Sequence, residues 1–131
     1  MKAISKSVST RVSKIEWSAR VELAAGYRLA DMFGFSDVIW NHITSKIPGT
    51  NYFLINRFGF RFDEVTASNL VTINLDGNVV DPGSETSDED VNLTGFVIHS
   101  AIHAARHDVM CVMHSHSQAG LVVSALKNGL V

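Results

Sequence analysis

Apolar residues recur at two different spacings along this chain, and the change of spacing limits its fold more than any other feature. From Val21 to Met32 they lie three or four residues apart, as on one face of a helix. Short strand-like runs follow, and helical spacing returns between Thr94 and Arg106. Strand-like and helical patterns that alternate along one chain predict a mixed α/β domain.

Capping and turn residues predict where the helices begin and end. Ser13 and Glu16 have the spacing of a capping box and Gly34 is a suitable stop residue, so we expect a helix over Lys14 to Phe33. The two further helices that we expect cover Thr94 to Arg106 and Leu121 to Leu126, the latter continuing toward Asn128 and Gly129.

Four runs of strand length accompany these helices. The continuous apolar run from Val109 to Met113 predicts a strand that is covered on both faces, and Cys111 within it should be a buried, unreactive thiol. The turn over residues 76–78 predicts a hairpin with Val79 and Val80, because Gly77 readily adopts a positive φ. The remaining runs are Ile43 to Ile47, Tyr52 to Asn56 and Leu70 to Leu75.

Composition limits the class of protein. With 131 residues, 46% of them hydrophobic, the chain can form one core, so we expect a flexible segment over residues 1–14 and one domain over residues 15–131. The net charge is −2 and no basic patch is present, which argues against a nucleic-acid partner. No run approaches about 18 apolar residues, so no membrane span is expected. A single cysteine fits a reducing, cytoplasmic compartment.

The residues that carry chemistry concentrate after the last strand-like run. His114 and His116 alternate, so both side chains should project from one face where the strand ends. Two imidazoles on one face suit Zn²⁺ or a similar cation, although a catalytic zinc site generally has three protein ligands. The alternative is a pair of half-buried structural histidines.

Three further histidines follow helical spacing. His99 and His103 share one helix face, and His107 should fall past the helix end. We expect one packed side chain, that of His99, and two near-surface ones, rather than a metal site. No nucleophile-elbow motif and no phosphate-binding glycine motif is present in the sequence.

The stretch from Thr94 to Ser117, TGFVIHSAIHAARHDVMCVMHSHS, resembles the class II aldolase/adducin family, and most closely its adducin-like branch. The resemblance extends to residues 20–35, to Asn41-His42-Ile43-Thr44 and to the run that begins at Tyr52. It implies a three-layer αβα domain around a central, mainly antiparallel sheet. The family domain is longer, so the resemblance also implies a domain that is incomplete at its C-terminal side.

The resemblance implies site residues and partners as well. His114 and His116 match the first two ligands of a divalent metal, zinc or another, and Asn41 and Thr94 match polar contacts to a substrate. Because the family's third metal histidine falls after Val131, we expect weak metal binding in this 131-residue form. The family usually forms homo-tetramers, so we expect a homo-oligomer. We also expect uncovered apolar surface along residues 109–113 and 121–126.

One departure divides the functional alternatives. The aldolases carry an acid/base glutamate where this sequence has Gly95, and a glutamate introduced there should point toward the metal. The first alternative is a metal-binding domain, with aldehyde-lyase activity on a sugar-derived or other hydroxy-carbonyl substrate undetermined. The second is a non-catalytic module for oligomerisation or interaction, like the head of the cytoskeletal, actin-binding adducins. A full sugar-phosphate aldolase or epimerase is disfavoured by Gly95.

Overall fold

The computed structural model describes residues 7–80 and 86–130, and it confirms the mixed α/β class. Its α-helices are α1 (Lys14–Met32), α2 (Leu93–Ala105) and α3 (Gln118–Ser124). Its strands are β1 (His42–Lys46), β2 (Phe53–Ile55), β3 (Val71–Ile73) and β4 (Cys111–His114). Short 3₁₀ helices cover Val8–Thr10, Phe62–Glu64 and Asp88–Asp90.

The first helix has the predicted ends, whereas the last one begins and ends earlier than expected. Ser13 Oγ accepts a hydrogen bond of 3.1 Å from the Glu16 amide at the start of α1, and Gly34 follows its end with a φ of 72°. A side-chain oxygen in this place satisfies an amide that has no partner inside the helix. The third helix ends at Ser124, before the expected Asn128-Gly129 cap.

The four strands form one antiparallel sheet in the order β3-β2-β1-β4. On one side of β1, Thr44 lies opposite Ile55 of β2. On its other side, His42 lies opposite His114 of β4. The expected hairpin after β3 is reduced to a single bridge between Ile73 and Val79, with Gly77 in the turn at a φ of 88°.

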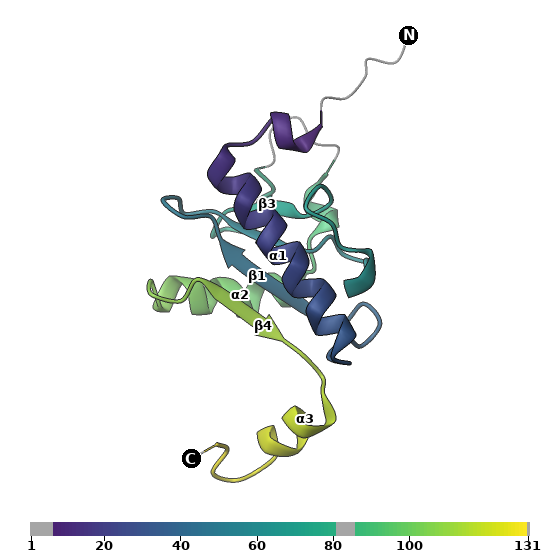
Figure 1. The fold of residues 1–131 in the computed structure, drawn as a ribbon. Coiled ribbons are helices and arrows are strands. Elements are labelled where there is room, and N and C mark those ends of the chain that lie inside the picture. The colour runs from purple at the N-terminus through teal and green to yellow at the C-terminus, as the bar shows by residue number, and fades with distance from the viewer. Residues whose placement is uncertain (1–6, 81–85, 131) are drawn as a thin grey trace.

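The sheet separates two layers of packing, which confirms the expected αβα arrangement (Figure 1). Side chains of a strand alternate between the faces of a sheet. Ile43 and Leu54 therefore pack with α1, where the core cluster also holds Leu23, Tyr27 and Phe62. The opposite face carries a second cluster, which Phe96 of α2 joins. Its buried members are Phe53, Ile55, Val71 and Ile73.

The edge strand β4 is covered on one face, and the expectation of cover on both faces is wrong. Cys111 and Met113 lie on the α1 side of the sheet and are exposed, because α1 packs over β1 and not over this edge. The expectation of a buried Cys111 is therefore wrong as well. The uncovered apolar surface expected here is confirmed. It continues into α3, which has no buried residue and lies apart from the sheet in Figure 1.

Two expectations concern segments that the structure describes in part. The proposed flexible segment 1–14 contains residues 1–6, which lie outside the described residues, and the 3₁₀ helix Val8–Thr10. Residues 81–85, the first half of a connecting loop over residues 81–90 that is rich in acidic side chains, also lie outside them, while Asp90 at its end accepts a 2.6 Å hydrogen bond from Arg57. Among the described residues, no helix is long and apolar enough to cross a membrane.

Candidate metal centre and its histidine cluster

The two histidines of the His-x-His motif face each other. His114 is the last residue of β4, and the Nε2 atom of His116 lies 2.8 Å from the Nε2 atom of His114. Both side chains are half-buried. Burial lowers the pKa of His114, and the nearby His116 lowers it further. A neutral imidazole keeps the lone pair that a metal ligand needs, so burial favours the ligand state of His114.

Asp37 orients one of these rings. Its Oδ2 atom lies 2.8 Å from Nδ1 of His116. A carboxylate only accepts hydrogen bonds, so Nδ1 of His116 donates and its Nε2 atom is left facing His114. Carboxylates commonly hold metal-binding histidines in this way. Sequence analysis missed Asp37, because no local pattern connects residues that are so far apart along the chain.

The turn that carries Asp37 has an unfavourable backbone conformation. The Trp40 amide donates to the Asp37 carbonyl at 3.0 Å, and Val38 between them has a φ of 48°. A positive φ is uncommon for a β-branched residue, and such strain is concentrated at functional sites. The side chain of Val38 is 62% exposed, so packing does not explain its presence. The strained turn leads directly into Asn41 and β1.

Asn41 is buried, and neither its side-chain oxygen nor its side-chain nitrogen has a hydrogen-bond partner among the described residues. A buried amide without partners is costly, and in a native protein it calls for an explanation such as a ligand or an ordered water. This geometry agrees with the predicted substrate contact, whose role stays a prediction. Thr94 is exposed, and its hydroxyl donates to Asn92 Oδ1 at 2.7 Å, within the N-cap of α2.

A third ring lies against the pair. His42 is opposite His114 in the sheet, and the two imidazoles stack with 4.8 Å between centroids and 13° between planes. Its Nδ1 atom lies 3.0 Å from Nε2 of His99. The side chain is 2% exposed, and burial, with the nearby His114 and His116, lowers the pKa of His42 to about 4. Sequence analysis did not single out His42, although its place beside Asn41 in a polar-apolar alternation was a usable signal.

The cluster continues away from the pair through a threonine. Thr44 Oγ1 lies 2.8 Å from Nδ1 of His99 and 2.9 Å from Nε2 of His103. A hydroxyl has one hydrogen, so it donates to one ring and accepts from the other, and no ring needs a charge. Burial, with smaller contributions from the neighbouring histidines, lowers the pKa of His99 to about 3.

His99 is packed, as expected, whereas the prediction of a near-surface His103 is wrong. Both side chains are fully buried, because α2 lies with this face against β1. His107 follows the end of α2 and is exposed, as predicted. Five of the chain's six histidines therefore contribute to one cluster.

Gly95 borders this cluster. A Cβ atom built on Gly95 would lie 2.9 Å from both Cγ and Cδ2 of His42, closer than such atoms approach one another. Position 95 therefore points toward the His42 ring, and its direction toward a metal stays a prediction. The space that a glutamate there would enter is already filled by the His42 ring, so a simple exchange of Gly95 for glutamate does not fit.

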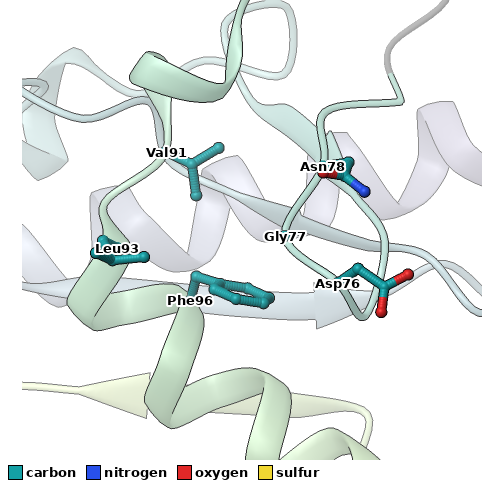
Figure 2. Close-up of a pocket in the computed structure, with 6 residues that line it drawn as sticks. All are labelled: Asp76, Gly77, Asn78, Val91, Leu93 and Phe96. Carbon is teal, nitrogen blue, oxygen red and sulfur yellow. The ribbon is translucent and has the colours of Figure 1, made fainter.

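A cavity of about 300 Å³ lies elsewhere, between the turn after β3 and the start of α2 (Figure 2). None of the residues that line it is a histidine. They are Asp76, Gly77, Asn78, Val91, Leu93 and Phe96. Among the described residues, no three His, Cys, Asp or Glu side chains come together as a metal site. The candidate centre is therefore the pair His114 and His116 with its supporting residues.

Comparison with known proteins gives consistent results. The model of the Class II Aldolase and Adducin N-terminal domain matches residues 21–131. An aldolase II superfamily protein from Pseudomonas syringae is 50% identical, with a TM-score of 0.87 over 96% of this chain and 50% of its own. An L-fuculose 1-phosphate aldolase from Glaciozyma antarctica is 33% identical, with a TM-score of 0.75 over 95% of this chain and 48% of its own.

Adducins match as well. Rat alpha-adducin is 50% identical over 126 residues, which are 95% of this chain and 17% of that protein. The chain spans about half the length of the bacterial relatives that it matches. Relatives with aldolase names and relatives with adducin names are thus similar to the same residues.

Proposed function

The chain belongs to the class II aldolase and adducin N-terminal domain family, and from this premise we propose that His114 and His116 are two ligands of a divalent metal ion, zinc or another. The observation that carries the proposal is the 2.8 Å approach of their two Nε2 atoms. The hydrogen bond from Nδ1 of His116 to Asp37 supports it, because it leaves the Nε2 lone pair directed at the same point.

A bound divalent cation would supply Lewis-acid polarisation of a carbonyl or hydroxyl oxygen. We propose a hydroxy-carbonyl or sugar-phosphate-like compound as the substrate class. Asn41 would bind it, because its amide offers two N–H donors and a carbonyl acceptor to the oxygens of such a molecule. The strained turn before Asn41 would fix the direction of that amide.

Proton transfer distinguishes this chain from a full sugar-phosphate aldolase. Gly95 has no side chain, and the carboxylate that contacts the pair, Asp37, is engaged by His116. A well-placed general base is worth about 10²- to 10⁴-fold in rate. We therefore propose that any lyase activity on ordinary sugar phosphates is slow.

Metal binding is tested by titration of the apo chain with Zn²⁺ and Co²⁺ in a calorimeter, followed by elemental analysis after dialysis. His114→Ala should weaken binding by at least about 10-fold, since it removes one ligand. The matched control is His107→Ala, which removes an exposed imidazole outside the cluster. Equal affinities of the parent chain and His114→Ala would contradict the proposal.

Activity is tested by aldehyde release from a panel of sugar phosphates in the presence of zinc, cobalt or manganese. We expect turnover to be very slow. Rapid metal-dependent release that His114→Ala abolishes would show that this chain has an efficient base after all.

A second candidate function, self-association or interaction like that of an adducin head, is favoured by exposed apolar side chains on α2. Leu93, Val97 and Ile98 are all exposed. Sedimentation of the parent chain should show oligomers, with a tetramer as the proposed state. Val97→Lys should reduce association, whereas Val21→Lys on the outer face of α1 should not. A monomer at every concentration would contradict this candidate.

A further inference from the structure

We infer that His42 fills the space beside the histidine pair that a side chain at position 95 would enter, and that it positions the His114 imidazole toward His116. The second part of this inference rests on the proposed metal-binding function. The first part rests on geometry alone and is tested without a metal.

The start of α2 fixes one side of the contact. Asn92 Oδ1 accepts hydrogen bonds from the amides of Thr94 and Gly95, at 3.1 Å and 3.4 Å. These bonds hold the first turn of the helix in place. Because a Cβ at position 95 would lie 2.9 Å from the His42 ring, any residue other than glycine there must displace that ring or the helix start.

The sheet fixes the other side. His42 is paired with His114 across β1 and β4, and the two rings stack nearly parallel. The stacking leaves His114 with one flat neighbour that sets the plane of its imidazole. That plane directs Nε2 of His114 toward Nε2 of His116.

The His42 ring is itself held from the side away from the pair. Its Nδ1 atom bonds to His99, and the second nitrogen of His99 bonds to Thr44. All three side chains are buried, with His42 at 2% and His99 and Thr44 at 0% exposure, so water does not replace these bonds. The orientation of His42 is therefore set by the packing of α2 on β1 and is passed on to His114.

His42 is thus a positioning residue, and its ring leaves no space for a side chain at position 95. This pairing explains a glycine in the first turn of a helix, where it has a conformational cost.

The first experiment is a double-mutant cycle on the metal-free chain. Gly95→Ala, His42→Ala and the double variant are compared by thermal unfolding and by the ¹H–¹⁵N signals of the His114 ring. In the parent chain, Gly95→Ala should lower the midpoint temperature of unfolding and shift the His114 ring signals. In the His42→Ala background, Gly95→Ala should leave the His114 signals unchanged, and the midpoint temperature should stay the same or rise, since alanine favours helix. An equal effect of Gly95→Ala in both backgrounds would overturn the inference.

The second experiment separates the stack from the hydrogen bond. His42→Phe keeps a flat ring beside His114, whereas His42→Asn keeps a polar group near His99 and loses the ring. Co²⁺ affinity should fall about 10-fold or more in His42→Asn, which is the range known for residues that support metal ligands. In His42→Phe the affinity should stay within about 3-fold of the parent.

The visible absorption spectrum of bound Co²⁺ should change in His42→Asn and be preserved in His42→Phe, a readout that a loss of stability alone would not move. Equal spectra and affinities in the parent and both variants would overturn the positioning role. If the parent binds no metal, the proposed function fails, and the cycle at positions 42 and 95 still decides the geometric part through the His114 signals.

Discussion

The two faces of the sheet bury different polar groups. A guanidinium, that of Arg20, is buried between α1 and the sheet, whereas three imidazoles are buried between α2 and the sheet. Arg20 is fully buried and donates hydrogen bonds to Glu16 at 2.9 Å, to the Leu70 carbonyl at 2.8 Å and to Thr72 at 2.6 Å. Arginine keeps its charge at every physiological pH, and here a carboxylate lies beside it. The α1 face therefore buries a permanent charge together with its partner.

The α2 face instead depends on groups that must stay neutral. The pKa values of His42 and His99 are lowered to about 4 and about 3, mainly because burial penalises the charged ring. Their hydrogen bonds need one donor and one acceptor at each contact, so an added proton places two donors face to face. The comparison shows that one sheet buries polar groups in two ways: a charged group with a carboxylate beside it on one face, and rings that have to stay neutral on the other.

The largest effect is expected from breaking the α1 face at its charge. Arg20→Met keeps much of the side-chain volume but removes the guanidinium that donates to Glu16, to Thr72 and to the Leu70 carbonyl. Removing one partner of a buried ion pair costs about 3–5 kcal/mol in the free energy of unfolding. Urea denaturation at neutral pH measures this. Arg61→Met, which removes only exposed ion pairs, should cost less than about 1 kcal/mol.

Acid should break the α2 face. A histidine with a folded-state pKa below its unfolded value near 6.5 contributes stability that is present above that value and lost as the pH falls toward the folded-state pKa. A fall in pH from about 7.5 to about 5.5 should therefore lower the free energy of unfolding by about 2–3 kcal/mol, through the lowered pKa values of His42 and His99.

The measurement is urea denaturation across this range in the presence of a chelator. His99→Gln should reduce the slope against pH, since one titrating ring is removed, whereas His107→Gln, on the surface, should preserve it. A flat pH profile of the parent chain would contradict the neutral histidine cluster.

Matched removal of one buried hydroxyl sharpens the comparison. Thr44→Val leaves ring nitrogens of His99 and His103 without a partner, and an unsatisfied buried group costs about 1–3 kcal/mol. Chemical denaturation at neutral pH checks this value. Thr66→Val, at an exposed threonine, should change stability by less than about 0.5 kcal/mol. Equal costs at the two positions would mean that the Thr44 hydroxyl does not hold the cluster together.

The smallest effect concerns the turn between α1 and β1, which carries Val38. Val38→Gly should raise the free energy of unfolding by up to about 1 kcal/mol, because relief of a positive φ outweighs the conformational cost of glycine. Val38→Ala keeps the positive φ and is the matched control. Thermal unfolding compares the two, and a glycine variant less stable than the alanine variant would show that the turn is not strained.

The sequence predicted the elements that rest on local signals. Ser13, Glu16 and Gly34 determine the ends of α1, and the alternating motif placed His114 and His116 together at the end of β4. The predictions that were wrong depended on neighbours. The spacing of residues along α2 does not show that β1 covers His103. The apolar run of β4 likewise does not show that α1 leaves Met113 uncovered.

The supporting residues of the site were beyond local reasoning for the same reason. Asp37 meets His116, and His42 meets Gly95, only after the chain has folded. Burial of both amide atoms of Asn41 likewise depends on the tertiary structure, although the residue itself was singled out from the resemblance.

The contact between Gly95 and His42 also limits how this site could be redesigned. A Cβ atom at position 95 would meet the His42 ring at 2.9 Å, so a carboxylate at 95 needs a smaller or reoriented side chain at 42. Two positions far apart in the sequence therefore have to be changed together in any attempt to introduce a general base here.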